Sequence, residues 1–171
     1  DLVGGAFRTE EREGFAHYSS VEFHSPNRLF IRAADAPDFV ASRLAELRGK
    51  DFRFGIQIGV SYSQEFDALA EDEVFSTQLE RLSSRQSLWQ MLDLGRVDGV
   101  IADEMTGRLE VKQLGLESRI SLSALEFPAA PSYFIFSRQT TTAAFVAQFD
   151  KHLRELIETA QYQGILDSYF K

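Results

Sequence analysis

Short apolar segments that run into a turn of small or polar residues, and then into a helical pattern, dominate this sequence. In "FRFGIQIGVSYSQEF" (52–66), apolar residues alternate as in a β-strand, and a glycine- and serine-containing turn leads into a short helix. In "RVDGVIADE" (96–104), a buried strand runs into two acids. This alternation of strands and helices predicts an α/β protein with a mostly parallel sheet.

Further elements follow from the same periodicities. The run 23–31 is expected to be extended and is interrupted by "SPN". A helix is expected over 35–48, where Val40 and the two following leucines share one face, and a strand is expected over 74–79. The clearest helical pattern lies near the C-terminal end of the chain.

Composition and charge exclude several classes of protein. The 171 residues suit one domain or two small ones, and a net charge of -8 without a basic run argues against a nucleic-acid partner. The chain has no cysteine, and His17, His24 and His152 are too isolated to suggest a metal site. No stretch of about 18 apolar residues exists to span a membrane. We therefore expect no metal and no other cofactor.

Asp103 and Glu104 follow a predicted strand directly. Adjacent residues of an extended segment point to opposite sides, so the two acids are poor candidates for one shared acid–base site. "D-E-M-T" suits Asp103 as the N-cap of the next helix. A ligand-binding role for Asp103 is the alternative, and both stay open at this point.

Two further candidates lie beyond predicted strands. Arg12 falls in the first turn of a helix expected after Thr9, either as a solvated side chain or as a binding residue. The loop "IGVSYS" (58–63) is either an ordinary strand-to-helix turn or a site whose N–H groups and hydroxyls bind a polar or anionic ligand. Open α/β sheets bind ligands beyond the carboxyl ends of their strands, which favours these positions together.

Four segments, in this order, resemble the polar amino acid group of the periplasmic solute-binding proteins (solute-binding family 3), which serve ABC importers. They are "DLVGGAFRTEER" (1–12), "LRGKDFRFGIQIGVSYSQEF" (47–66), "LGRVDGVIADE" (94–104) and "QGILDSYF" (163–170). The resemblance implies the α/β type II periplasmic-binding fold, in which two α/β lobes are joined by two crossover strands. It also implies that hinge closure clamps a ligand between the lobes.

Mapped onto this chain, the resemblance divides it into five parts. Residues 1–28 would be part of lobe one, 29–32 a hinge strand, 33–130 lobe two, 131–138 a second hinge strand, and 139–171 the C-terminal helices of lobe one. The family's opening strand and helix have no counterpart here, so we expect an incomplete lobe one. Its exposed flank would favour a homodimer or strand exchange with a second copy.

The resemblance also assigns binding roles to individual residues. Arg12 matches the arginine that binds a ligand's α-carboxylate with its planar fork, and Asp103 matches the acid that binds the α-ammonium. Val60 and Ser61 fall where the family often has paired Thr or Ser residues that help to hold the carboxylate. Phe7 replaces a frequent Ser or Thr and would offer a stacking surface instead.

The function implied is a non-enzymatic receptor in the periplasm or another extracytoplasmic space. It would capture a small polar, amino-acid-like ligand for an ABC importer permease. Arg8 adds a positive charge that could meet a second acidic group of the ligand. The alternatives are the ligand-sensing domain of a signalling receptor, a dehydratase-type enzyme with Glu104 as its proton-transfer residue, or a cleft that has lost binding. No catalytic residue is expected for the leading interpretation.

Overall fold

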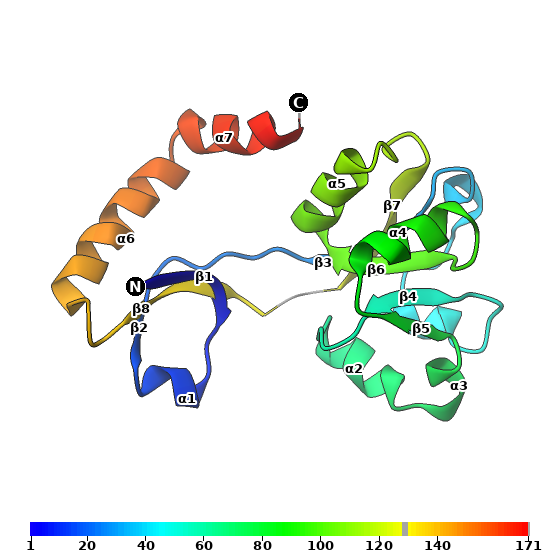
Figure 1. Ribbon diagram of the computed structural model, residues 1–171, viewed down its shortest axis with the longest axis horizontal. Coiled ribbons are helices and arrows are strands. Elements are labelled where there is room, and N and C mark those ends of the chain that lie inside the picture. Colours follow the sequence, from blue (N-terminus) through cyan, green and yellow to red (C-terminus); the bar gives the residue numbers. More distant parts are fainter. Residues whose placement is uncertain (128–129, 171) are drawn as a thin grey trace. The chain divides into compact units, whose positions relative to one another are not determined.

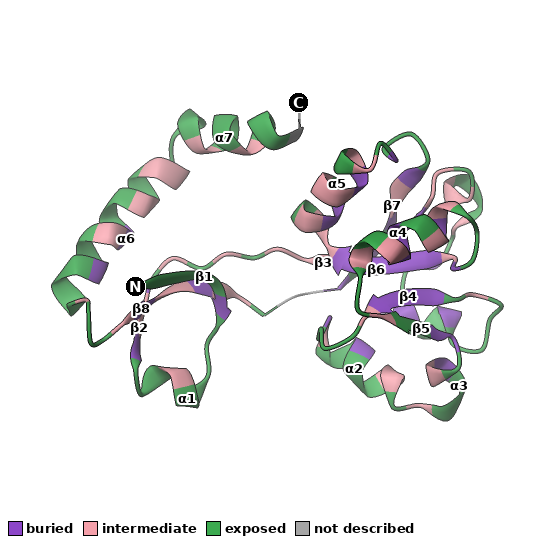
Figure 2. Cartoon of the chain, in the orientation of Figure 1, coloured by how far each residue is buried: buried purple, intermediate pink, exposed green. Residues whose placement is uncertain are grey.

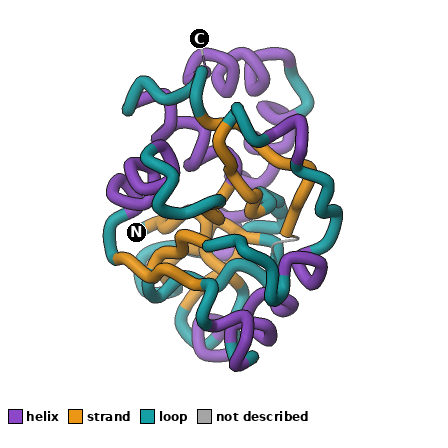
Figure 3. Tube along the Cα trace, turned by 90° about the vertical axis from the view of Figure 1, so that its right-hand side faces the viewer, coloured by secondary structure: helices purple, strands orange, loops and turns teal. Residues whose placement is uncertain are grey.

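The computed structural model describes residues 1–127 and 130–170 (Figure 1). The chain forms two compact units: unit 1 is Asp1–His24 with Ala130–Lys171, and unit 2 is Ser25–Ala129. Each unit contains strands and helices, which confirms the predicted α/β class. Figure 3 colours the helices, strands and loops along the chain. In the described part, no helix has both the length and the apolar character needed to cross a bilayer.

Unit 2 is a five-stranded sheet with strand order β5-β4-β6-β3-β7. Helices α4 and α5 lie over one face, and α2 and α3 lie on the other side (Figure 1). In chain order, with η for a 3-10 helix, the elements are β3 (Asn27–Arg32), η1 (Ala36–Asp38), η2 (Leu44–Leu47), β4 (Phe54–Gln57), α2 (Gln64–Ala70), α3 (Glu73–Ser76), β5 (Leu79–Leu82), α4 (Arg85–Asp93), β6 (Gly99–Asp103), α5 (Glu104–Gln113) and β7 (Ile120–Phe127).

Both faces of this sheet are buried. Successive side chains of its central strands point to opposite faces, and side chains of both sets lie in a hydrophobic cluster. In β3, Leu29 and Ile31 belong to one hydrophobic cluster, which includes residues of η2, α2 and α3. Phe30 belongs to the second cluster, which includes residues of α4 and α5. Buried residues are accordingly concentrated in β3, β4 and β6 (Figure 2).

Most strand pairs are antiparallel, so the prediction of a mostly parallel sheet is wrong. Only β4 has parallel neighbours among the described strands, namely β5 and β6. Strand β3 runs antiparallel to both β6 and β7, with Asn27 opposite Asp103 on one side and Phe127 on the other. The path of the chain explains these antiparallel pairs, because β3 begins at the edge of unit 2 at which β7 ends. That edge also holds the carboxyl ends of β4 and β6.

Unit 1 contains a three-stranded antiparallel sheet of order β1-β8-β2. Its elements are β1 (Leu2–Phe7), α1 (Glu10–Glu13), β2 (Ala16–Tyr18), β8 (Ser132–Ser137), α6 (Ala143–Ile157) and α7 (Ala160–Phe170). Strand β1 is an edge strand, and its apolar residues Leu2 and Val3 are exposed. Such an edge can accept another strand, so the expected pairing with a second copy stays a prediction.

Two local predictions are wrong. The expected helix 35–48 is instead two short 3-10 helices, separated by an extended Arg43, and Val40 is 90% exposed instead of facing the core. The expected strand 74–79 begins as helix α3, because Asp72 accepts hydrogen bonds from the first N–H groups of that helix. An N-cap of this kind favours a helical turn over an extended chain.

Residues 29–32, one expected hinge strand, form most of β3 in the core of unit 2. Residues 131–138, the other expected hinge strand, contain β8, the central strand of the unit 1 sheet. The five-part division with its two hinge strands stays a prediction. The parts of the expected ranges 33–130 and 139–171 that fall on residues 128, 129 and 171 lie outside the described residues.

Candidate functional site

Asp103 is the last residue of β6 and the N-cap of α5. Its Oδ1 accepts hydrogen bonds from the N–H of Thr106 at 2.9 Å and from the Thr106 hydroxyl at 2.7 Å. Its Oδ2 accepts a hydrogen bond from the Ser25 hydroxyl. None of the ion pairs formed between described residues includes Asp103. Asp103 therefore caps a helix and still carries a partly buried negative charge without a basic partner.

Glu104, the next residue, is neutralised by its neighbours. Its Oε2 accepts a hydrogen bond from Arg28 at 2.9 Å, and its Oε1 accepts one from Arg108 at 2.9 Å. Each of its two carboxylate oxygens thus already has a guanidinium donor from the protein. This geometry favours a structural role for Glu104 over proton transfer.

Val60 and Ser61 lie in the loop between β4 and α2. Gly59 precedes them with a φ of 80°, a conformation that glycine adopts without strain. The Ser61 hydroxyl donates to Asp67 Oδ2 at 2.5 Å, and Ser63 is the N-cap of α2. Within the described chain, no protein acceptor pairs with the backbone N–H of Ser61. Of the two hydrogen-bond donors of Ser61, the N–H is therefore the one without an acceptor among the described residues.

Tyr62 anchors this loop to the sheet. Its hydroxyl accepts the N–H of Gln57 at 2.7 Å, and burial raises the pKa of the Tyr62 phenol above its usual value. Its carbonyl oxygen accepts a hydrogen bond from Asn27 Nδ2 at 2.8 Å. Because Asn27 lies opposite Asp103 in the sheet, the structure brings the loop and Asp103 to one edge of unit 2.

Arg12 lies in α1 of unit 1, a short helix capped by Thr9 as predicted. Its Nη1 donates a hydrogen bond to the carbonyl oxygen of Phe7 at 2.8 Å. The ion pairs between described residues do not include Arg12, so its charge has no acidic partner there. Phe7 is 48% exposed. The structure thus brings Arg12 and Phe7 together within unit 1.

Arg8, in contrast, already has an acidic partner. Its Nε lies 2.6 Å from Glu13 Oε1, and its guanidinium lies 5.2 Å from the centre of the Tyr18 ring. The hydrogen bond to Glu13 raises the pKa of Arg8. This pairing leaves Arg8 less suited than Arg12 to bind an acidic group of a ligand.

Sequence reasoning missed two residues next to Asp103, namely Ser25 and Asn27. The "SPN" segment indicated only a break in an extended run, although small polar residues on both sides of a proline, directly before a buried strand, are the signal that could have identified them. Among the residues described, no group of three acidic, histidine or cysteine side chains is arranged to hold a metal ion.

Comparison with solved structures identifies the fold. One match is AbpA from Streptococcus pneumoniae, the substrate-binding protein of an amino acid ABC transporter, bound to L-arginine. The match covers 99% of this chain and 68% of the AbpA chain, with 20% identity and a TM-score of 0.66. A second match is substrate-binding domain 2 of Lactococcus lactis GlnP, in an open conformation. This match covers 96% of this chain and 66% of the GlnP domain's chain, with 16% identity and a TM-score of 0.70.

A sensor domain of a histidine kinase, similar to periplasmic binding proteins, also matches. The match covers 99% of this chain and 69% of the sensor domain's chain, with 18% identity and a TM-score of 0.63. No protein-family model matches the sequence, and no curated protein matches it. The chain therefore has the periplasmic-binding-protein-like fold of amino acid substrate-binding domains, as predicted, and spans about two thirds of the solved chains.

Proposed function

We propose that the protein is an extracytoplasmic solute-binding protein that captures a small polar, amino-acid-like solute for an ABC importer. One observation carries the proposal: each unit presents a charged candidate residue without an ion-pair partner among the described residues, Arg12 in unit 1 and Asp103 in unit 2. An amino acid carries the two groups that such side chains bind, a carboxylate for the guanidinium fork and an ammonium for the aspartate.

Two further features support an amino-acid-like solute. The N–H of Ser61, which has no acceptor among the described residues, would donate to a carboxylate of the solute, whereas Val60 has no hydroxyl to add a bond. The exposed ring of Phe7 would cover an apolar or planar part of the solute's side chain. Together these features favour a solute with a carboxylate, an ammonium and a side chain that can pack on an aromatic ring.

A thermal-shift screen followed by calorimetry tests this proposal on the full chain. The panel contains amino acids, opines, polyamines and small carboxylates. We expect at least one α-amino acid to raise the melting temperature, since a ligand at 100 times its Kd adds about 2.7 kcal/mol of stability. Polyamines lack the carboxylate and simple carboxylates lack the ammonium, so neither should bind comparably. Binding of these compounds without any amino acid would contradict the proposal.

Solute sensing is a second candidate, favoured by the likeness to the histidine-kinase sensor domain. Both functions need the same binding chemistry, so ligand data do not separate them. The full reading frame and the neighbouring genes separate the two functions. A membrane-spanning helix followed by a kinase domain supports sensing, and a co-encoded permease supports import. An enzyme is less favoured, because Glu104 is neutralised and these solved neighbours are binding proteins and a sensor domain.

A further inference from the structure

Three consecutive residues, Ser25 to Asn27, each contact a different part of the candidate site in unit 2. The Ser25 hydroxyl donates to Asp103 Oδ2. The carbonyl oxygen of Pro26 accepts the N–H of Glu104, the first residue of α5, at 3.0 Å. Asn27 Nδ2 donates to the carbonyl oxygen of Tyr62, which ends the exposed part of the Val60–Ser61 loop.

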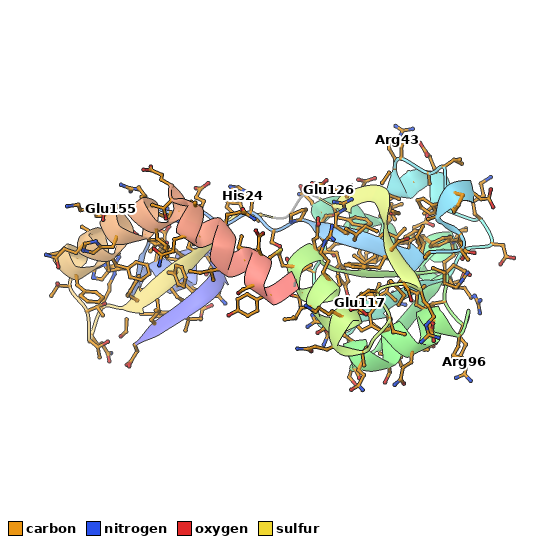
Figure 4. All side chains as sticks on the ribbon, turned by 90° about the horizontal axis from the view of Figure 1, so that it is seen from above. His24, Arg43, Arg96, Glu117, Glu126 and Glu155 are labelled. Carbon is orange, nitrogen blue, oxygen red and sulfur yellow. The ribbon has the colours of Figure 1, made fainter. Side chains whose placement is uncertain are left out.

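This segment is also where the chain enters unit 2. Ser25 follows His24, the last residue of the first stretch of unit 1, which Figure 4 labels on the extended segment leading to β3. The orientation of Asp103 is therefore set partly by the segment through which the chain passes from one unit to the other.

Hydrogen bonds on both oxygens fix the plane of the Asp103 carboxylate. Thr106 holds Oδ1 and Ser25 holds Oδ2, which removes the rotation that an aspartate otherwise has about its last torsion angle. Each carboxylate oxygen can accept two hydrogen bonds, so Oδ2 keeps a free lone pair. A charged group that is already oriented loses less freedom when a ligand binds.

We propose that Ser25 is a positioning residue, which orients Asp103 for the ammonium of the solute. This inference rests on the proposed function, since it assumes that Asp103 binds an ammonium. Ser25 acts through Asp103, so its loss should weaken the binding of solutes that carry an ammonium and spare the same solutes without it.

Calorimetry on the full chain tests this with two compounds that differ only in the ammonium. The probes are L-arginine and its des-amino counterpart, 5-guanidinopentanoate; if L-arginine does not bind, the amino acid with the largest thermal shift and its des-amino counterpart replace them. Ser25→Ala removes a hydrogen bond to a charged group. We expect this loss to raise the Kd of the amino acid about tenfold. We expect the Kd of the des-amino compound to change by less than about twofold.

Two control variants accompany Ser25→Ala. Ser25→Thr keeps the hydroxyl and should restore amino acid binding to near the parent value. Ser42→Ala removes another serine hydroxyl that donates to a carboxylate of unit 2, that of Glu46, and should bind like the parent. The melting temperature of each variant shows that it is folded under the conditions of the titration.

The possible outcomes separate this inference from the proposed function. Equal weakening of both compounds, unchanged amino acid binding or tighter binding by Ser25→Ala would each overturn the positioning role while the proposed function stands. A parent protein that binds no amino acid would overturn the proposed function, and the role of Ser25 with it.

Discussion

Thr106 donates two hydrogen bonds to a single oxygen of Asp103, one from its N–H and one from its hydroxyl. The helix cap therefore occupies Oδ1, while among the described residues the Ser25 hydroxyl is the single partner of Oδ2. Capping α5 and binding a ligand are thus compatible roles for one carboxylate, because they use different oxygens.

The capping role predicts a stability difference between two variants of Asp103. Asp103→Ala removes the cap and should lower the free energy of unfolding by about 1 kcal/mol. Asp103→Asn keeps an oxygen for Thr106 and should lower it by less. Denaturant unfolding followed by the fluorescence of Trp89, the single and fully buried tryptophan of unit 2, measures both. Equal stability of Asp103→Ala and the parent would exclude a stabilising cap.

The carboxylate role predicts a specific loss for Arg12→Lys. A lysine cannot present two parallel donors to a carboxylate, so binding of the best amino acid in the screen should weaken about tenfold or more. The matched control is Arg8→Lys, since Arg8 lies in the same unit and is paired with Glu13. We expect Arg8→Lys to leave the Kd near the parent value in calorimetry. Identical affinities of Arg12→Lys and the parent would remove Arg12 from the site.

The pair of Arg48 and Asp72 predicts a pH dependence. The hydrogen bond from Arg48 is the main cause that lowers the pKa of Asp72 from 3.8 to about 2, and two N–H groups of α3 add to it. The folded state therefore resists protonation more than the unfolded chain does. The stabilisation by Asp72 is complete above pH 3.8 and is lost as the pH falls toward 2.

An NMR titration of the aspartate carboxyl carbons measures this pKa directly. We expect Asp72 to titrate near 2 in the parent and closer to 3.8 in Arg48→Met. An Asp72 that titrates at 3.8 in the parent would contradict the geometry of the pair.

Close packing of α5 on β3 predicts that Gly107 cannot be replaced. A Cβ atom at Gly107 would lie 2.4 Å from the ring of Phe30, which is buried. Gly107→Ala should therefore cost about 1–3 kcal/mol, despite the higher helix propensity of alanine. The control is Gly164→Ala in α7, where a Cβ meets no atom within 4 Å and should gain about 0.5–1 kcal/mol. Thermal unfolding followed by circular dichroism compares them, and a stabilised Gly107→Ala would contradict this packing.

Features that depend on a few neighbouring residues could be predicted from the sequence. The cap at Thr9 could be predicted, and a cap was one of the two roles considered for Asp103, because a cap and its donors lie within three residues. The α/β class followed from strand and helix periods that are equally local.

Features that depend on distant residues could not be predicted. The direction of β3 is set by its position between β6 and β7, which follow it by many residues. The buried residues Leu44 and Leu47 are spaced by three, as in the 3-10 helix that they bound, and helical periodicity through Val40 did not reveal this. The contact of Ser25 with Asp103 joins residues 78 positions apart, so the "SPN" segment can draw attention to Ser25 but does not indicate its partner.

The most direct test of the zwitterion site is calorimetry of one amino acid and its two truncated forms on three proteins. With L-arginine as the first probe, the truncated forms are agmatine, which lacks the carboxylate, and 5-guanidinopentanoate, which lacks the ammonium. The parent should bind each truncated form at least about tenfold more weakly than the amino acid. Arg12→Lys should lose most of the preference over agmatine, and Asp103→Asn most of the preference over 5-guanidinopentanoate. Variants that both keep the parent's preferences would contradict the assignment of Arg12 and Asp103 to the two ends of a zwitterion.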